Sequence, residues 1–336
     1  MKLKSLILAL IFSVVSVSAL VAEEKKEGAM GKLSGKAYFQ YTHELDDNSD
    51  GDRDGKFTLD RVYVTWKKSI GEKLAARVTV DASDKTDAGE KYGEFYVKYA
   101  YFQYKDEFVG IKSKAQVGLI GTPILGLTDK LGGMRWITKN ALDNKSIEAS
   151  ADLGASLALD FMGFATLTAA VLNGDGYKQI TQNIDNGVAV DGLLSITPMK
   201  GLYINGFARY HDNQESDYSE SYFGGGAAWK GKVLKVGGNF TYVNDTQSTS
   251  KLGDSKGMII DAWVNSNLDG LIGLPILAMT RVVYLKPDTG NDTIEFGIGS
   301  GYKFNKNLQS LVWFDMDKED GSDTNMNLSV KFEFKY

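Results

Sequence analysis

The chain of 336 residues has no cysteine, 4 prolines and 2 histidines. The lack of cysteine excludes a disulfide framework and a thiolate metal site. His43 and His211 are the only imidazoles available as bases, and the strand pattern described below groups neither with a serine and an acid on one patch. We therefore expect no enzymatic activity.

The first residues have the order of a secretory signal peptide. Lys2 and Lys4 supply a basic start, residues 6–17 are apolar, and small residues follow. We expect a signal peptide within residues 1–22, cleaved after Ala19 or Ala22, and a mature domain over 23–336. Since no cysteine follows the apolar run, a lipid-anchored lipoprotein is excluded.

Long uninterrupted apolar runs are also missing from the mature chain. Residues 153–172 are mostly apolar but contain Asp160 and Gly163, and residues 271–285 contain Pro275 and Arg281. A membrane-spanning helix needs about 18 or more apolar residues with few charges. A charge at the bilayer centre costs about 2.5 to 3.5 kcal/mol. The first stretch is better divided into two strands that turn at residues 162–163.

The residues that are abundant indicate long β-strands. Gly 37, Tyr 17 and Phe 16 accompany a hydrophobic content of 43%. Residues 325–336 alternate without exception, with apolar residues at the even positions and polar residues at the odd ones. Soluble strands are typically about 5 to 6 residues long, whereas a strand that crosses a bilayer needs about 9 to 11. Residues 293–304 repeat the pattern, with aromatic residues toward the strand ends.

Similar patterns recur along the chain and predict an all-β fold, a 16-stranded antiparallel transmembrane β-barrel. Short turns alternate with longer polar loops, which is typical of outer-membrane barrels, and both termini are then expected in the periplasm. Within lipid only a closed sheet leaves no unpaired edge. The predicted strands are 34–45, 57–68, 73–84, 94–105, 111–121, 150–161, 164–173, 188–197, 201–211, 221–230, 233–243, 257–268, 276–287, 293–304, 308–317 and 324–336.

Several short motifs support a family resemblance. The terminal segment 332–336, Phe-Glu-Phe-Lys-Tyr, looks like the C-terminal insertion signal of outer-membrane proteins, with Phe334 and Tyr336 as its aromatic residues, although Tyr replaces the usual final Phe. The segments at 60–63, 100–101, 152–154 and 171–176 resemble the phosphate-selective porin O and P family, and support "porin" far more than "phosphate".

The resemblance implies a passive channel for small hydrophilic solutes and ions in the outer membrane of a Gram-negative bacterium. It also implies a homotrimer inserted by the barrel-assembly machinery, and a third outer loop, residues 122–145, that folds inward to narrow the pore. No nucleic-acid partner is expected.

Ion selectivity would depend on the charges that line the lumen. The polar faces of the predicted strands carry several basic residues, and the third loop carries Arg135. A basic wall would attract anions despite the net charge of −5, because the local field acts on a permeating ion. The alternative is that these side chains lie near the rims or pair with acids such as Asp81. The candidate pore-lining residues are Arg61, Arg77, Lys98, Lys112, Lys114, Arg135, Arg209 and Arg281.

The first outer loop resembles part of a calcium-binding loop. Its oxygen-bearing side chains alternate, and Gly51 stands at the sixth place. Phe57 occupies the twelfth place, where a bidentate Glu is needed, and the flanks are strands rather than helices, so a hydrated acidic surface loop is the favoured interpretation and calcium binding is the alternative. The candidate ligands are Asp46, Asn48, Asp50, Asp52 and Asp54, and no other cofactor is expected.

Two other functions remain open at this point. An adhesin or receptor would act through its outer loops, which are usually longer than those predicted here. An enzymatic barrel is less favoured because of the histidine count given above.

Overall fold

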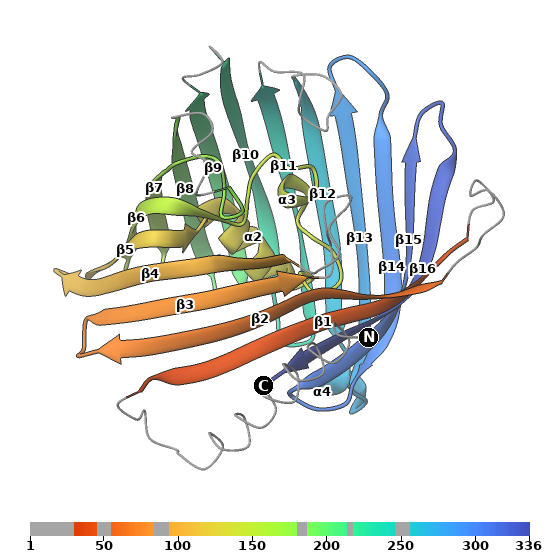
Figure 1. Ribbon diagram of the computed structural model, residues 1–336, viewed down its shortest axis with the longest axis horizontal. Helices are drawn as coiled ribbons and strands as arrows, with labels where there is room; N and C mark the ends of the chain where they lie inside the picture. The colour runs from red at the N-terminus through yellow and green to blue at the C-terminus, as the bar shows by residue number, and fades with distance from the viewer. Residues whose placement is uncertain (1–29, 46–54, 84–93, 180–186, 214–217, 246–255) are drawn as a thin grey trace.

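The computed structural model describes residues 30–45, 55–83, 94–179, 187–213, 218–245 and 256–336. These residues form one closed antiparallel barrel in which each strand pairs with its neighbours in the sequence, and β1 pairs with β16 to close it (Figure 1). The strands are β1 (Lys32–Glu44), β2 (Lys56–Ile70), β3 (Leu74–Ser83), β4 (Glu94–Phe108), β5 (Ile111–Gly121), β6 (Ala151–Phe161), β7 (Ala165–Leu172), β8 (Val188–Met199), β9 (Leu202–Asn213), β10 (Tyr218–Lys230), β11 (Leu234–Asp245), β12 (Lys256–Asn267), β13 (Ile276–Pro287), β14 (Thr293–Lys303), β15 (Leu308–Glu319) and β16 (Thr324–Lys335).

The expected 16-stranded barrel is confirmed, and every strand begins and ends within three residues of its predicted position. The apolar stretch 153–172 forms β6 and β7, which turn at Met162 and Gly163, both with positive φ (55° and 74°). Within the described part of the chain, no helix is long and apolar enough to cross a membrane.

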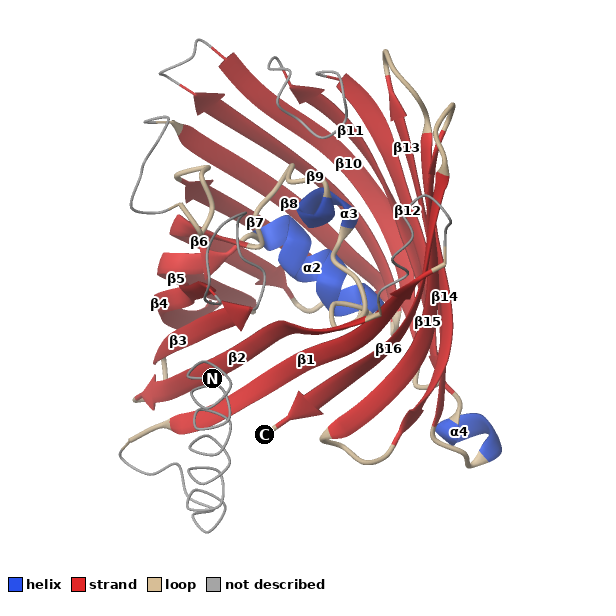
Figure 2. Cartoon of the chain, turned by 45° about the vertical axis from the view of Figure 1, so that its right-hand side comes forward, coloured by secondary structure: helices blue, strands red, loops and turns tan. Residues whose placement is uncertain are grey.

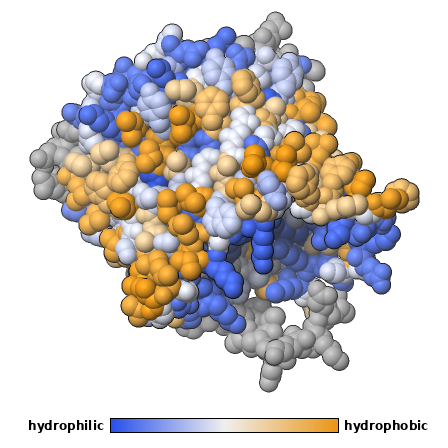
Figure 3. All heavy atoms as spheres, turned by 180° about the vertical axis from the view of Figure 1, so that it is seen from behind, coloured by the Kyte–Doolittle hydropathy of each residue, from blue (hydrophilic) through white to orange (hydrophobic). Residues whose placement is uncertain are grey.

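The outer wall is apolar because alternate residues of each strand point away from the lumen. Figure 3 shows a band of apolar side chains across the surface seen from behind, with hydrophilic side chains gathered above it and again around the hollow below it. Large exposed apolar residues occur along both halves of the barrel, for example Phe102, Val117, Val171, Ile204, Phe223, Ile260, Ile298, Val312 and Leu328.

Two short helices lie inside the barrel rather than on its surface (Figure 2). They are α2 (Pro123–Gly132) and α3 (Ala141–Asn144), and both belong to the segment between β5 and β6. A third helix, α4 (Asp269–Ile272), forms the turn between β12 and β13.

The inner face of the barrel is less polar than strict alternation predicts. Ile124 and Leu125 of α2 pack in a cluster with Leu193, Phe207 and Tyr222 of the wall. A second cluster places Leu131 and Met134 against inward residues of β12, β13 and β15, including Trp263, Met279 and Trp313. Apart from Thr280 and Arg281, the run at residues 276–285 is therefore apolar on both faces, because one face points outward and the other supports the inward loop.

Candidate functional site

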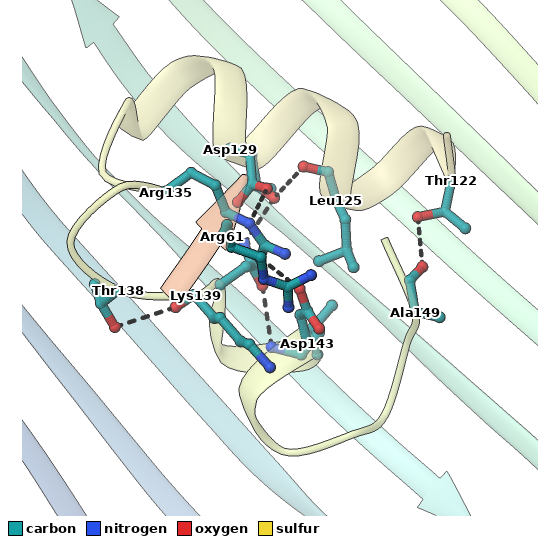
Figure 4. A network of polar contacts seen from close by, with 12 residues as sticks. Arg61, Thr122, Leu125, Asp129, Arg135, Thr138, Lys139, Asp143 and Ala149 are labelled. Carbon is teal, nitrogen blue, oxygen red and sulfur yellow. Dashed lines mark hydrogen bonds and ion pairs between the residues drawn. The ribbon is translucent and has the colours of Figure 1, made fainter. Parts of the chain in front are cut away.

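The segment between β5 and β6, residues 122–150, forms a loop that narrows the lumen. Pro123 stands in the first turn of α2, where its missing N–H costs no hydrogen bond. Gly133 ends the helix with φ 68°, a left-handed conformation that favours glycine. At the base of the loop the Thr122 hydroxyl donates to the Ala149 carbonyl at 2.9 Å (Figure 4). This hydrogen bond joins the two ends of the loop.

Side-chain contacts hold the inward loop to strands β10, β12, β13, β14 and β16. Arg281 of β13 makes the most extensive of them: it donates to Thr138 Oγ1 and to the Lys139 carbonyl, and its other nitrogens bind both carboxylate oxygens of Asp261 at 2.8 and 2.7 Å. Further contacts are Asn265 Nδ2 to Gly132 O (2.9 Å), Lys331 Nζ to Ile137 O (2.8 Å), Lys145 Nζ to Glu295 (2.5 Å) and Tyr222 OH to Glu148 Oε2 (2.6 Å).

The tip of the loop presents a partly buried arginine. Arg135 forms ion pairs with Asp129 (3.8 Å) and with Asp143, both from the same loop (Figure 4). Burial raises the pKa of Asp129 and would raise that of Asp143, but Arg135 and Lys139 outweigh burial at Asp143 and hold its pKa below the usual range. The guanidinium of Arg135 stays charged at every accessible pH.

The wall formed by β2, β3 and β4 carries a second charged group. Arg61 of β2 pairs with Asp81 of β3, and Tyr177 bonds to both, at 2.9 Å in each case. Lys98 of β4 approaches Asp81 at 3.8 Å. Lys98 reaches this position because the register shifts between Thr79 and Val80, so that it is the extra residue of a bulge. The narrow part of the lumen therefore lies between two arginine-centred groups.

Two cavities flank this constriction, and Tyr38 and Arg135 border both. The larger, which we call the vestibule, has a volume of about 510 Å³ and is lined by six basic residues and one acidic residue, Asp129. Its basic residues are Lys36, Lys67, Arg77, Lys98, Arg135 and Lys335. The smaller cavity, about 200 Å³, is lined by Arg61, Arg135, Lys139 and Lys331 with one acid, Asp60.

The wall beside β14 and β15 carries more acidic residues. A cavity of about 220 Å³ beside β14 and β15 is lined by Glu295, Asp315 and Asp317 together with Arg281 and Lys331. Positive charge is thus concentrated on the β1–β4 side of the lumen and is not spread evenly around it.

The structure groups some of the predicted pore-lining residues and separates others. Arg61, Arg77, Lys98 and Arg135 line the two cavities on either side of the constriction. Lys114 is half-buried on β5, and Lys112 is exposed beside the turn that joins β4 and β5. Arg209 and Arg281 lie beneath the loop: Arg209 is buried between Glu148 and Asp191, at 3.6 and 3.3 Å, and Arg281 anchors the loop tip. These two residues support the loop and line neither the vestibule nor the smaller cavity beside the constriction.

Sequence reasoning missed several vestibule residues. Lys36, Lys67 and Lys335 occupy polar-face positions in the predicted strands, so the alternation marks them as inward. Only the register brings them together, because Lys36 lies opposite Lys335 and Lys67 opposite Arg77.

The five candidate calcium ligands, Asp46 to Asp54, lie outside the described residues, so the calcium site stays a prediction. In the part of the chain that is described, no group of three or more His, Asp or Glu side chains is arranged to hold a metal ion.

Comparison with solved structures relates this arrangement to known barrels. An anion-selective porin from Comamonas acidovorans superposes with a TM-score of 0.66 at 10% sequence identity, covering 91% of this chain and 99% of that one. The outer membrane channel DcaP of Acinetobacter baumannii gives 0.65 at 12% identity (91% and 96% covered), and Salmonella typhi OmpF gives 0.64 at 14% identity (91% and 97% covered). The chain has the porin fold. No protein-family model matches the sequence, and no curated protein matches it. At these identities the likeness concerns the fold alone.

Proposed function

We propose that the chain is a porin of the outer membrane of a Gram-negative bacterium, a passive channel for small hydrophilic solutes that favours anions and catalyses no reaction. One observation carries the proposal: an inward loop narrows the lumen, and the charged residues that line the cavities on both sides of the constriction are mostly basic. Both termini are then periplasmic, and the barrel-assembly machinery would recognise Phe334 and Tyr336. A homotrimer is part of the same proposal.

The physical reason for anion preference is the local field. The lining of the vestibule has six basic residues against one acid, and that of the smaller cavity has four against one, so a permeating ion would meet a positive local field; acids outside these linings are screened by salt over about 10 Å. Two of the similar structures are described as an anion-selective porin and as an outer membrane channel, which supports the proposal.

The test is electrical recording in planar bilayers. A porin should insert with discrete conductance steps, and in a salt gradient its zero-current potential should indicate anion preference. Replacing Arg61 and Arg77 together by Ala should shift that potential toward cations, because two charges leave the cavity linings and Asp81 loses its arginine partner. Replacing Lys286 and Lys318 by Gln removes the same charge from exposed positions at the other end of the barrel and should change the potential little. A cation-selective wild-type channel would refute the anion preference.

The alternative is a barrel that acts through its outer loops as an adhesin or receptor, and it predicts no conductance steps. An enzymatic barrel is disfavoured because the two histidines lie on β1 and β9, well separated in the strand order.

A further inference from the structure

The outer wall of the barrel carries an apolar groove that extends from Leu74 on β3 to Val190 on β8, across strands that pair in sequence order (Figure 1). Its volume is about 530 Å³, and among the described residues none of those that line it is charged. Phe102, Val117 and Val171 line it and are each more than half exposed. An exposed apolar surface of this size marks a site for lipid or protein.

The groove is deep because short side chains alternate with long ones across the sheet. Ala115 of β5 stands between Tyr104 of β4 and Leu157 of β6 in the register of the strands. Ala155 of β6 likewise lies opposite the larger Val171 of β7. Each alanine leaves room beside a bulkier neighbour. The resulting depression in an apolar wall suits a flexible hydrocarbon chain.

A pair of opposite charges borders the groove. Tyr104 lines the groove, and its hydroxyl donates to Asp106 Oδ2 at 2.8 Å. Lys73 precedes the groove residue Leu74 and donates to Asp106 Oδ1 at 2.7 Å. The side chains of Lys73 and Asp106 are 54% and 37% exposed. Exposed ion pairs contribute little to stability, and both groups are accessible to a ligand that occupies the groove.

The charged pair lies at the level of the short turns. Lys73 belongs to the turn between β2 and β3, and Asp106 lies two residues before the end of β4. In the proposed orientation the short turns are periplasmic, so this pair meets the headgroups of the periplasmic leaflet and the groove meets acyl chains. Tyr104 lies between the two, with a ring beside the groove and a hydroxyl on Asp106, as aromatic residues do at membrane interfaces.

The two charges favour one headgroup chemistry. A phosphate would accept hydrogen bonds from Lys73, and a primary ammonium would donate to Asp106, and both contacts would be charge-assisted. A trimethylammonium group has no N–H to donate, and a glycerol headgroup brings no cation to Asp106. A zwitterionic headgroup with a primary amine is therefore complementary to both members of the pair.

We propose that the groove and the Lys73–Asp106 pair form a binding site for one phospholipid of the periplasmic leaflet, with an ethanolamine headgroup. One acyl chain lies in the groove, the phosphate lies at Lys73 and the ammonium at Asp106. A second copy of the chain at this face would have to bury both charges, which costs free energy unless it supplies new partners. The inference rests on the proposed outer-membrane location and adds a lipid partner that solute diffusion does not require.

Native mass spectrometry of the purified barrel in mild detergent counts the bound lipids. Phosphatidylethanolamine, phosphatidylcholine and phosphatidylglycerol with identical acyl chains are added in equal amounts. The wild type should retain one phosphatidylethanolamine per chain, about fivefold more often than either other lipid, because two exposed charge contacts distinguish them. Lys73→Gln/Asp106→Asn should lower its retention to that of phosphatidylcholine. Lys232→Gln/Asp269→Asn, which removes the same charges from exposed residues at other short turns, should keep the preference.

A second pair of variants tests the groove itself. Ala155→Phe places a large ring in the groove and should lower the retention of all three lipids. Ala262→Phe places the same ring on the exposed outer face of β12, away from the groove, and should retain lipids as the wild type does.

The outcomes separate this inference from the proposed function. Equal retention of the three lipids, or an unchanged preference in Lys73→Gln/Asp106→Asn, would overturn the lipid site. Efficient disulfide crosslinking between copies of Val117→Cys, in a chain without other cysteines, would show that a second copy covers the groove and would also overturn it. Conductance steps without a lipid preference refute the site and leave the channel function standing. A lipid preference without conductance steps supports the site although the channel function fails.

Discussion

Arg281 offers the most direct test of how the inward loop is held. Its side chain is 9% exposed and that of Asp261 is 8% exposed, so solvent screens this bidentate pair little. The Arg281→Ala variant leaves Asp261 buried without its partner and removes two hydrogen bonds to the loop, those to Thr138 and to the Lys139 carbonyl. Breaking a buried pair on one side costs about 3 to 5 kcal/mol, and we expect the free energy of unfolding to fall by that amount.

A double-mutant cycle isolates the pair. Asp261→Ala alone should also destabilise the barrel, because it leaves a buried guanidinium unpaired. The double variant should lose less than the sum of the two, with a coupling energy of about 0.5 to 3 kcal/mol between contacting residues. Lys318→Ala, an exposed change on β15, is the control and should stay within about 0.5 kcal/mol of the wild type.

Urea titration of the barrel in lipid vesicles provides the assay. Tryptophan fluorescence should follow the transition well, because Trp263 and Trp313 lie in the cluster that supports the loop. Single-channel currents of Arg281→Ala should also become noisier, since the loop tip would be missing two of its hydrogen bonds to the wall. A loss below about 1 kcal/mol, or strictly additive single changes, would refute the idea that this pair is the main anchor.

Three further predictions test other parts of the chain. In Gly35→Ala the new Cβ would overlap the Tyr336 ring and lie 2.5 Å from the Tyr63 carbonyl, so closure of the β1–β16 seam should slow. The appearance of the heat-modifiable band on gels measures the rate of closure. Gly192→Ala is the control and should fold at the wild-type rate, because nothing lies within 4 Å of its new Cβ. Burial and the nearby Asp191 raise the pKa of Glu148 from 4.5 to about 8, although Arg209 opposes the shift. The stability that the protonated Glu148 contributes should therefore be complete below pH 4.5 and be lost as the pH rises through 8. Glu148→Gln should abolish that fall in unfolding free energy, and an unchanged pH profile would contradict the assignment. Calorimetry with millimolar calcium tests the first outer loop: the calcium site predicts saturable heat, and a hydrated acidic loop, the favoured interpretation, predicts none.

The strands could be predicted because their periodicity is long and simple. In β16 every second residue is apolar over twelve positions, and neither a helix nor a short soluble strand needs that pattern. The turn at residues 162–163 was likewise predictable, since Asp160 and Gly163 interrupt the middle of a mostly apolar stretch. These are local properties, which a single strand already displays.

The candidate site was predictable only in part. Alternation indicated that Arg61 and Arg77 face inward. The bulge at Lys98 breaks the alternation in β4, and no local sequence pattern predicts it. Arg209 and Arg281 have the same pattern as the open-lumen arginines, yet the inward loop covers them. Whether an inward arginine meets water or a loop depends on a segment far away in the sequence.

The number of strands, their faces and the closed barrel follow from local patterns in the chain, because a backbone in lipid must pair every strand and the period-two pattern indicates which side meets hydrocarbon. Which charges act together depends instead on long-range contacts. Lys36 and Lys335 are almost the whole chain apart and become neighbours when β1 pairs with β16. The vestibule and the constriction arise from that closure and from the packing of α2 against apolar inward residues, and both are long-range contacts that no segment contains on its own.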